Sequence, residues 1–439
     1  MLPYSERRRR ILDGISGDVM IVPGARQLTR SNDTEFSFRQ SSDFFYLTGF
    51  DEPDALLVLA PQHAGHKSIL FLRERDRIKE IWNGRRLGSA AAPGALGIDA
   101  AYPIEELADR LPEYIVGART LHYTFGADES RDRTVQAALD AARAKARRDN
   151  HAPARFADPA IPIHEMRLFK TDDEIAIMRR AAEATRRGHV AAMRATRPGL
   201  HEYEIEATIE YEYARAGAQC PAYESIVGTG ENATILHYVT NRDVLKEGDL
   251  LLVDSGAEVD CYTCDVTRTW PVNGRFSAEQ RAIYEIVLAA QEASIARVHA
   301  GAPRNAFHEV SVRVIAEGLI DLGLLKGSAD EAIEKETYKD FYMHGTGHWL
   351  GLDVHDVGSY LDAEDKPRLL QAGMVTTVEP GIYVQRDLDV DERFKGIGVR
   401  IEDDILVTAG GNDNLTQAIP KTIAEIEALV GSAAHAGVA

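Results

Sequence analysis

The sequence predicts an α+β protein with two domains, a smaller α/β domain over residues 1–165 and a larger domain over residues 166–439. Length is the first reason, because a single hydrophobic core seldom grows beyond about 250–300 residues and this chain has 439. The second reason is that short apolar runs alternate with helical stretches in the first part, as in a mixed or parallel sheet. The third is that one order of elements occurs twice in the second part, which indicates an internal repeat.

The composition indicates a soluble globular protein with an acidic surface. Hydrophobic residues make up 44% of the chain and charged residues 27%, and the formal net charge is -19. Such a charge repels the phosphates of nucleic acids, so we expect no nucleic acid partner. Only three cysteines occur, which is typical of a reducing compartment such as the cytoplasm. Because the sequence lacks a run of about 18 apolar residues, we expect no membrane span.

In the first domain, short apolar runs predict buried strands, and helical stretches lie between them. The strands are expected at residues 18–23, 55–60, 68–73 and 120–123, and the helices at 5–15, near 104–116 and near 130–147. The arginines of the first helix, Arg7–Arg10, are expected on a solvated face. Residues 80–86, which include Trp82 and two arginines, are expected to form a turn. Residues 150–162 contain three prolines and are expected to link the two domains.

In the second domain, a helix, a Pro/Gly break, a second helix and a β hairpin follow one another twice. Each half opens on a capping box, Thr171 with Glu174 and then Ser277 with Gln280. The helices are expected from Thr171 to before Arg197, from 201 to 216, from Ser277 to Ala300, and up to about Gly323. Strands are expected at roughly 222–240, 249–272, 340–357 and 373–408. Two such halves, related by a pseudo-twofold axis, would face their hairpins toward a shared cleft, where we expect a site.

Each hairpin carries a pair of acids. Asp254 ends the apolar run LLLVD, and the turn that follows would place Asp265 opposite it. Glu379 ends a strand at a Pro-Gly stop, and the returning strand would place Glu402 opposite it. Two carboxylates about 5 Å apart at the inner end of a hydrophobic strand cannot both ionise at low cost unless a cation lies between them.

The Gly-rich run Phe341–Gly358 holds three of the fourteen histidines, His344, His348 and His355. Glycine costs roughly 1 kcal/mol relative to alanine inside a helix, so an extended strand leading into a tight turn is expected here. The glutamate of the helical HExxH zinc motif is also missing. Three ordinary, partly buried histidines are the alternative interpretation.

Four carboxylates and one imidazole together predict a site for two divalent metal ions, because four negative charges balance two M²⁺ ions. Oxygen-rich ligation with one imidazole favours Mn²⁺, with Co²⁺, Fe²⁺ or Zn²⁺ as alternatives. A hydroxide between the two ions would be available near neutral pH as a nucleophile. The CxxC pair Cys261 and Cys264 is interpreted as incidental, because it lies in a hairpin without a second pair.

The ligands, in the order Asp254, Asp265, His348, Glu379 and Glu402, resemble the dinuclear site of the pita-bread metallopeptidases. Within this group, the strings HGTGHWLGLDVHDVG, TVEPGIY, GVRIEDD, SDFFYLTGF and EIWNGRRLG are most similar to the bacterial Xaa-Pro aminopeptidases, also called aminopeptidase P. The likeness covers nearly the whole chain. It implies a pita-bread second domain, a metal-dependent aminopeptidase that hydrolyses the N-terminal Xaa-Pro bond of peptides, and a homo-oligomer, either a dimer or a tetramer.

The resemblance also implies roles for individual residues. Asp265 and Glu402 would bridge both metals, Asp254 would bind one of them, and His348 and Glu379 would bind the other. The implied catalytic residues are His237, His344, His355, Glu379 and Arg400, and the implied substrate-binding residues are Tyr223, Tyr383 and Trp82. Trp82 matches a residue that reaches a neighbouring subunit's site in tetrameric relatives.

Two departures from the family pattern are visible. Gly347 stands where close bacterial relatives often have Ser, and Lys366 and Arg368 match only loosely the basic residues that the family has there.

The expected reaction is attack of the hydroxide on the scissile carbonyl, whose oxygen one metal and His237 would polarise. Glu379 would hold the nucleophile and move a proton, and His355, or a water that it holds, would protonate the proline amine as it leaves. Tyr223 and residues 349–352 would form an apolar wall for the proline ring.

An Xaa-Pro dipeptidase with the same site is the main alternative. A methionine aminopeptidase fits less well because those enzymes lack this N-terminal domain. The complete ligand set disfavours a creatinase-type hydrolase, and together with the acidic charge it disfavours a non-catalytic binding protein.

Overall fold

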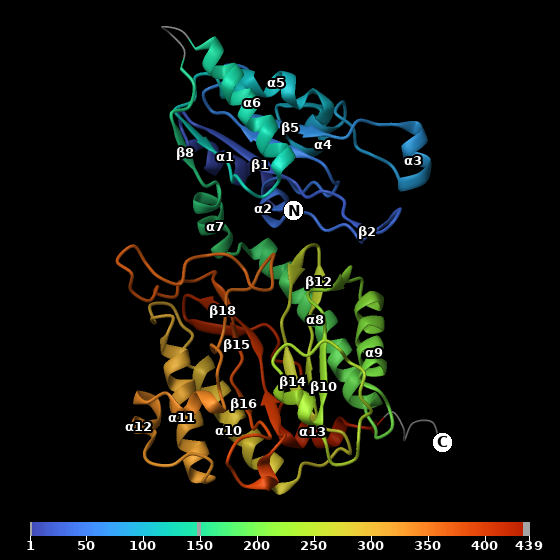
Figure 1. Cartoon of the computed structure of the whole chain (residues 1–439), viewed down its shortest axis with the longest axis vertical. Helices are drawn as coiled ribbons and strands as arrows, with labels where there is room; N and C mark the ends of the chain where they lie inside the picture. The colour runs from blue at the N-terminus through green and yellow to red at the C-terminus, as the bar shows by residue number, and fades with distance from the viewer. Residues whose placement is uncertain (1, 147–150, 433–439) are drawn as a thin grey trace. The chain divides into compact units, whose positions relative to one another are not determined.

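The computed structural model describes residues 2–146 and 151–432, which form two compact units, Met1–Arg167 and Leu168–Ala439 (Figure 1). Each unit has its own sheets and its own core. Among the residues described, no helix combines the length and the apolar character needed to cross a membrane.

The first unit is built on a mixed sheet with the strand order β6-β5-β4-β1-β7-β8. Its strands are β1 (Val19–Pro23), β4 (Leu56–Leu59), β5 (Ser68–Leu72), β6 (Ala100–Pro103), β7 (Thr120–His122) and β8 (Arg155–Ala157). β4 runs antiparallel to both of its neighbours, and the remaining pairs are parallel. The four strands predicted from apolar runs are all present. A separate hairpin joins β2 (Thr29–Ser31) to β3 (Thr34–Glu35).

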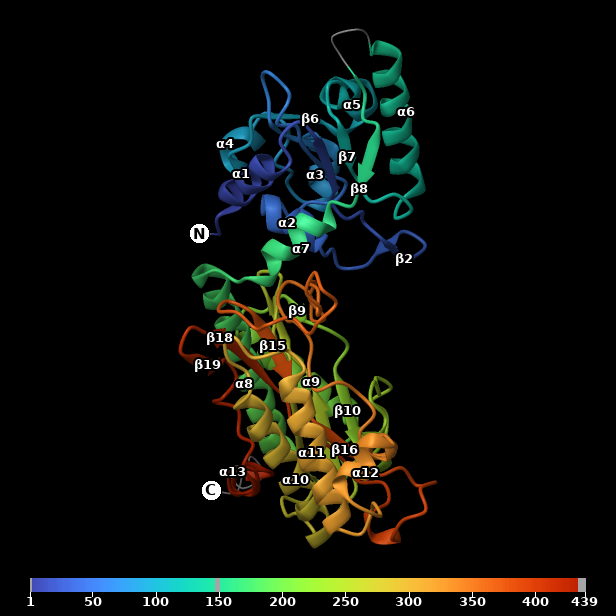
Figure 2. The ribbon, with the colours of Figure 1, turned by 90° about the vertical axis from the view of Figure 1, so that its left-hand side faces the viewer.

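Helices cover both faces of this sheet. The helices of the chain up to Leu168 are α1 (Tyr4–Gly14), α2 (Ser42–Thr48), α3 (Arg77–Asn83), α4 (Ala92–Leu96), α5 (Leu107–Ile115), α6 (Glu129–Lys145) and α7 (Ala160–Leu168), with a 3₁₀ turn at Ile104–Glu106, and not all of them lie on the sheet. Figure 2 shows α5 and α6 on one side of the sheet and α1 and α2 on the other. Val19 and Ile21 of β1 pack in one apolar core with Leu111 of α5 and Leu139 of α6. The predicted end of the third helix, residue 147, lies outside the described residues.

Two arginines of α1 are buried, contrary to the expectation of a solvated face. Arg7 and Arg8 are each 2% exposed. The Arg8 guanidinium donates to the carbonyls of Leu47, Leu96 and Gly97, and Arg7 donates to the carbonyl of Tyr46. A run of arginines in a sequence predicts an exposed surface, but main-chain carbonyls can accept the hydrogen bonds of a buried guanidinium.

Residues 80–86 begin inside a helix, whereas a turn was predicted. The side chain of Asp76 accepts hydrogen bonds from the N–H groups of Ile78 and Lys79 and so caps α3. The helix ends at Asn83, where Gly84 takes a φ of +92° that other residues rarely adopt.

The predicted linker is also largely ordered secondary structure. Arg155–Ala157 forms the edge strand β8, and α7 begins at Ala160. Asn150, where the linker was expected to begin, lies outside the described residues. A three-residue edge strand carries too little apolar pattern to be recognised beside prolines.

The second unit contains the predicted pairs of helices. They are α8 (Asp172–Ala195) and α9 (Glu202–Arg215) in the first half and α10 (Ala278–Ile295) and α11 (Ala306–Asp321) in the second, followed by α12 (Ala329–Glu334) and α13 (Ile423–Leu429). Both predicted capping boxes form, at the start of α8 and at the start of α10. α8 and α9 lie on one side of the strands, and α11 and α12 on the other (Figure 1).

The strands of the second unit are antiparallel and fall into two related sets. The first half holds β9 (Cys220–Pro221), β10 (Ile226–Thr229), β11 (Leu250–Asp254), β12 (Ala257–Val259), β13 (Tyr262–Thr263) and β14 (Thr267–Pro271). The second half holds β15 (Val375–Val378), β16 (Gly381–Tyr383), β17 (Gly398–Arg400), β18 (Asp403–Thr408) and β19 (Gly411–Asn414). The 3₁₀ turns are Gly230–Thr234, Thr337–Asp340 and Glu392–Phe394.

The predicted register is correct in the second half and wrong in the first. β15 pairs Val378 with Asp403 and β16 pairs Gly381 with Arg400, so Glu379 lies opposite Glu402 as expected. In the first half, by contrast, Asp254 pairs with Thr267 rather than with Asp265. The short hairpin of β12 and β13 keeps the same register as β11 and β14, and its turn lies at Asp260 and Cys261, one residue later than a pairing of Asp254 with Asp265 requires.

The His-rich run Phe341–Gly358 is not the strand that was predicted. Its described backbone forms turns and bends, with one isolated bridge from Trp349 to Thr376 of β15. The run lies so close to β15 that a Cβ at Gly347 would approach the carbonyl oxygen of Thr377 to 2.0 Å, closer than any side chain can. Glycine at this position therefore allows the backbone to reach the strand.

Candidate active site

A cavity of about 600 Å³ opens in the second unit, and most of the predicted site residues line it. Its lining comprises Tyr223, Glu224, Ile226, Leu236, His237, Val239, Asp254, Asp265, His344, Gly345, Gly347, His348, Val354, His355, Tyr360, Glu379, Arg400 and Glu402. Both halves of the repeat contribute to this set. The cavity therefore lies where the sequence predicts a cleft between the hairpins.

Asp265, His348 and Glu402 come closest together. One possible ligand atom from each lies within 4.8 Å of the others. His348 Nε2 is 3.4 Å from Asp265 Oδ2 and 3.6 Å from Glu379 Oε1. Asp254 is connected through the phenol of Tyr223, whose oxygen lies 2.6 Å from Asp254 and 2.5 Å from Asp265. Four carboxylates and one imidazole thus meet in one place.

The backbone explains why His348 points at the acids. Its N–H donates to the hydroxyl of Thr377 at 3.0 Å, and its Nδ1 faces the carbonyl of Trp349 at 3.0 Å. A bond at Nδ1 leaves Nε2 free to face Asp265 and Glu379.

Arg400 connects the acids from the side. Its guanidinium, 3% exposed as a residue, lies 2.6 Å from Asp254 and also donates to the hydroxyls of Thr267 and Tyr383 at 3.0 Å each. The hydroxyl of Thr267 in turn donates a hydrogen bond to Glu402 Oε2 at 2.7 Å. One guanidinium therefore fixes an acid from each half, one directly and one through a threonine.

Burial and mutual repulsion raise the pKa of three of the four acids. Burial raises the pKa of Glu402 well above its usual range, and the charges of Asp265 and Glu379 add to the effect. Burial raises the pKa of Glu379 to about 7, with Asp265 adding to the rise and His348 opposing it. Burial also raises the pKa of Asp254, although Arg400 opposes it. These acids favour a neighbouring positive charge.

Asp265 and His348 form the oppositely charged pair at the centre. Burial opposes ionisation of both, but the hydrogen bond from His348 lowers the pKa of Asp265. The same bond, with the charge of Glu379, raises the pKa of His348 to about 9. The imidazolium and Arg400 are thus the cations that the acids attract in this structure.

The donor set fits divalent metal ions. Three buried carboxylates and the partly buried Glu379 face only two cationic side chains here, so negative charge is in excess. Carboxylate oxygens with one imidazole are the ligands that Mn²⁺ and related ions prefer. Each acid is also held in place by a hydroxyl, guanidinium or imidazole group, as expected for ligands of a preformed centre.

Hydrogen bonds fix the tautomer of His344. Arg400 donates to the oxygen of Tyr383, so the phenol donates its own proton to His344 Nε2 at 2.8 Å. His344 Nδ1 then donates to the carbonyl of Gly345 at 2.8 Å. Burial, with the charge of Arg400, lowers the pKa of His344 to about 3 and keeps this ring neutral.

His237 and His355 are the exposed imidazoles of the cavity. The ring of His355 meets that of His348 edge to face, with centroids 4.3 Å apart. His237 makes no hydrogen bond to another residue within the described part of the chain. Both rings are therefore free to contact a bound molecule.

The apolar wall differs from the predicted one. Trp349 and Leu350 are fully buried, and Trp349 packs in the core with Phe307 and Leu370 instead of lining the cavity. The apolar lining residues are Ile226, Leu236, Val239, Val354 and Tyr360. Tyr223 contacts two acids through its hydroxyl, so it serves the carboxylate cluster as well as the wall.

Tyr383, a predicted substrate-binding residue, is fully buried and does not line the cavity, and three further residues named from the sequence do not line it either. Trp82 is on α3 of the first unit and is 82% exposed. Lys366 forms an exposed ion pair with Glu364, and the guanidinium of Arg368 lies over the ring of Phe169 at 5.9 Å.

Three threonines of the site were not predicted from the sequence. Thr267, Thr377 and Thr346 hold Glu402, His348 and the Gly-rich run through hydrogen bonds. Their only signal was position, since each lies within two residues of a proposed ligand. Threonine is also common in strands for its β propensity, so that signal is weak.

The doubled helix–hairpin fold around an acid-rich centre defines a pita-bread metallohydrolase. Comparison with known families agrees: a family model for metallopeptidase family M24 matches residues 176–409, and a model for the aminopeptidase P N-terminal domain matches residues 4–123. The chain belongs to metallopeptidase family M24.

Individual relatives match over nearly the full length. The chain is 45% identical over 432 residues to the Xaa-Pro aminopeptidase of Escherichia coli (strain K12), which covers 98% of each chain. Aminopeptidase PepP from Pseudomonas aeruginosa has a similar structure, with a TM-score of 0.96, 47% identity and 98% coverage of each chain. Zinc-substituted E. coli aminopeptidase P in complex with product gives a TM-score of 0.94 at 45% identity, again with 98% coverage of each chain.

Proposed function

We propose that this chain is an Xaa-Pro aminopeptidase, which hydrolyses the bond between the first residue of a peptide and a proline in second position. The observation that carries the proposal is the cluster of four carboxylates and one imidazole in a cavity that also presents two exposed histidines. Full-length similarity to Xaa-Pro aminopeptidases supports this substrate class over an Xaa-Pro dipeptidase.

Five side chains would hold two divalent metal ions. Asp265 and Glu402 would be shared between the ions, Asp254 would complete one site, and His348 with Glu379 the other. When bound, the ions would supply a hydroxide nucleophile at neutral pH and would polarise the scissile carbonyl. Mn²⁺ is the preferred ion, with Co²⁺, Fe²⁺ and Zn²⁺ as alternatives.

The side chains around the metal ligands would position the peptide and move protons. Glu379 would accept a proton from the nucleophile and return it later. His237 would donate a hydrogen bond to the carbonyl oxygen as its charge develops. His355 would protonate the proline nitrogen, because a secondary amine is too basic to leave without a proton.

The hydrogen bonds from Arg400 to Tyr383 and from Tyr383 to His344 would keep the same donors and acceptors during the reaction. Each of these residues donates a hydrogen bond to the next, so neutral His344 keeps its proton on Nδ1 and donates it in a hydrogen bond to the Gly345 carbonyl. This chain would hold Arg400 against Asp254.

The apolar side of the cavity would recognise proline. An Xaa-Pro bond has no amide hydrogen, so its site needs an apolar surface rather than a hydrogen-bond acceptor. Ile226, Leu236, Val239, Val354 and Tyr360 provide such a surface.

The direct test compares three peptides after chelation and restoration of Mn²⁺. We expect cleavage of Ala-Pro-Ala that disappears with the chelator and returns with Mn²⁺, and little cleavage of Ala-Ala-Ala. Exclusive cleavage of the dipeptide Ala-Pro would contradict the assignment and favour a dipeptidase.

We also propose that the chain forms a homo-oligomer, a dimer or a tetramer, in the cytoplasm. Ile78, Ile81 and Trp82 of α3 are 71%, 73% and 82% exposed, and adjacent large apolar side chains of this kind are typical of a protein interface. A content of only three cysteines fits a reducing compartment. Light scattering on the purified protein would measure the number of subunits, and a monomer would contradict the first part.

A further inference from the structure

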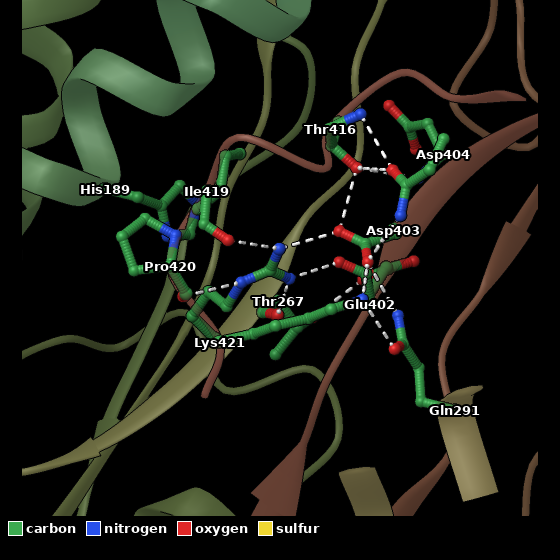
Figure 3. A network of polar contacts seen from close by, with 12 residues as sticks. His189, Thr267, Gln291, Glu402, Asp403, Asp404, Thr416, Ile419, Pro420 and Lys421 are labelled. Atoms are coloured by element: carbon green, nitrogen blue, oxygen red, sulfur yellow. Dashed lines mark hydrogen bonds and ion pairs between the residues drawn. The ribbon is translucent and has the colours of Figure 1, made fainter. Parts of the chain in front are cut away.

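A second network of charged side chains lies buried behind Glu402 (Figure 3). Its centre is the ion pair of Arg268 and Asp403, whose side chains are both 0% exposed and whose Nη2 and Oδ1 atoms are 2.6 Å apart. Neither residue lines the cavity. The mechanism proposed above uses neither of them.

Asp403 is saturated with donors. Apart from Arg268, it accepts from Lys421 at 2.6 Å, Gln291 at 2.8 Å, Asn414 at 2.9 Å and Thr416 at 2.9 Å. Burial alone would raise the pKa of this carboxyl, but the charges of Arg268 and Lys421 hold it well below its usual range. Asp403 therefore remains ionised with its charge fully compensated.

Arg268 connects this carboxylate to main-chain carbonyls on both sides of the site. Its Nη1 donates to the carbonyls of Thr267 at 2.9 Å and Glu402 at 2.5 Å. Its Nε and Nη2 donate to the carbonyls of Pro420 and Ile419 at 3.1 Å each. The guanidinium thus fixes three separate segments of the chain, one of which carries Glu402.

Side chains alternate between the two faces of the strands, so the contacts of Arg268 and Asp403 on one face hold the backbone that carries Glu402 on the other. Successive residues of an extended chain point to opposite faces, so the side chains of Thr267 and Glu402 lie on the face of the acid cluster, the front, while those of Arg268 and Asp403 lie on the opposite face, the rear. On the front, Thr267 Oγ1 donates to Glu402 Oε2 at 2.7 Å, and the Glu402 N–H donates to the Thr267 carbonyl at 3.0 Å. The rear pair, Arg268 and Asp403, and the front pair, Thr267 and Glu402, therefore lie on the same two stretches of backbone.

Stability alone is a weak reason for such a pair. Removing two charges from water costs several kcal/mol per ion, and apolar residues of similar volume can often replace a buried ion pair without loss. A planar guanidinium gives fixed directions to several carbonyls at once, which an apolar side chain cannot do.

We propose that Arg268 and Asp403 are positioning residues that hold the Glu402 carboxylate in the orientation needed to bind metal. This inference rests on the proposed function, in which Glu402 is a ligand shared by two ions. It assigns to the rear network a role in metal retention rather than in catalysis itself.

The test compares two buried arginines by the same substitution. Arg268→Lys keeps a positive charge beside Asp403 but loses the planar fork that reaches the Glu402 and Thr267 carbonyls. Arg8→Lys is the matched control, since Arg8 is buried in the first unit and donates to three main-chain carbonyls. Mn²⁺ binding to the metal-free proteins is measured by calorimetry, and unfolding by circular dichroism.

We expect Arg268→Lys to weaken Mn²⁺ binding about 10–100-fold, the usual effect of losing a group that orients a ligand. Arg8→Lys should lose stability but bind Mn²⁺ like the wild type. Binding by Arg268→Lys within twofold of the wild type would overturn the proposal. If the wild type bound no Mn²⁺, the proposed function would fail, and this inference with it.

Lys421→Met provides a milder variant if Arg268→Lys does not fold. It removes one donor from Asp403 at a side chain that is 16% exposed, so the fold should tolerate it. We expect about three- to tenfold weaker Mn²⁺ binding, and unchanged binding would again overturn the proposal.

Discussion

Glu402 and Asp403 are neighbours in sequence and equally buried, yet their surroundings are opposite. Glu402 faces three other carboxylates, and burial with their charges raises its pKa. Asp403 faces Arg268 and Lys421, and its pKa is lowered despite burial. The rear of the strand is neutralised by the protein itself, while the front carries an excess of negative charge. The difference indicates that the rear is a support and the front is a site for cations.

The largest effect on activity should follow from changing Glu402 on the front face of the strand. Glu402→Gln removes a shared metal ligand with almost no change in shape, so we expect at least a thousandfold loss of kcat/KM, or about 4 kcal/mol. Hydrolysis of Ala-Pro-Ala with excess Mn²⁺ measures it. A loss of less than tenfold would mean that Glu402 is not an essential ligand.

Changing the rear network should also lower the stability of the fold, in addition to its expected effect on metal binding. Asp403→Asn leaves Arg268 and Lys421 without their carboxylate, so we expect the free energy of unfolding to fall by about 3–5 kcal/mol. In the metal-free protein, Glu402→Gln should raise it by about 1 kcal/mol, because one of several repelling acids is neutralised. Urea unfolding of both variants compares the two signs. Equal destabilisation by both would remove the contrast between front and rear.

His189 should give the rear side a pH dependence of its own. Its ring is fully buried with Nε2 2.9 Å from the Ser255 carbonyl, and burial, with the charge of Arg268, lowers its pKa to about 4. The unfolded chain binds this proton near pH 6.5, so stability is complete above that pH and is lost as pH falls from about 6.5 to about 4.

The expected loss from His189 is about 3 kcal/mol over that window. His189→Gln should flatten the curve of unfolding free energy against pH between 6.5 and 4 by this amount. An unchanged slope in the variant would show that His189 does not titrate in this way.

A smaller effect is expected at the exposed imidazoles of the front. His237→Ala should lower kcat/KM about a hundredfold, since it removes a donor to the developing oxyanion but no ligand. Metal content, measured by atomic emission, should stay at the wild-type level. Loss of metal in this variant would place His237 among the ligands instead.

The sequence predicted the front of the strand much better than the rear. Glu379 and Glu402 could be paired from the hairpin because the strands between them keep one register. The pairing predicted for Asp254 and Asp265 failed because the turn of the first hairpin lies at Asp260 and Cys261, one residue later than that pairing requires. The phenol of Tyr223 and the ring of His348 still bring Asp265 into the cluster.

The rear network had no usable signal in the sequence. Arg268, Asp403 and Lys421 each resemble ordinary surface charges, and their burial depends on contacts across more than a hundred residues in the case of Arg268 and Asp403. Arg7 and Arg8 were misjudged for the same reason. Charged residues are seldom fully buried unless paired, and the pairing is a property of the folded chain.

The number of Mn²⁺ ions bound per chain tests the central claim most directly. Calorimetric titration of the metal-free protein should give two ions per chain for the wild type, and Glu402→Gln should lose at least one of them. A wild-type chain that binds no Mn²⁺, or a Glu402→Gln variant that binds two ions as tightly as the wild type, would contradict the assignment of the acid cluster as a dinuclear metal site.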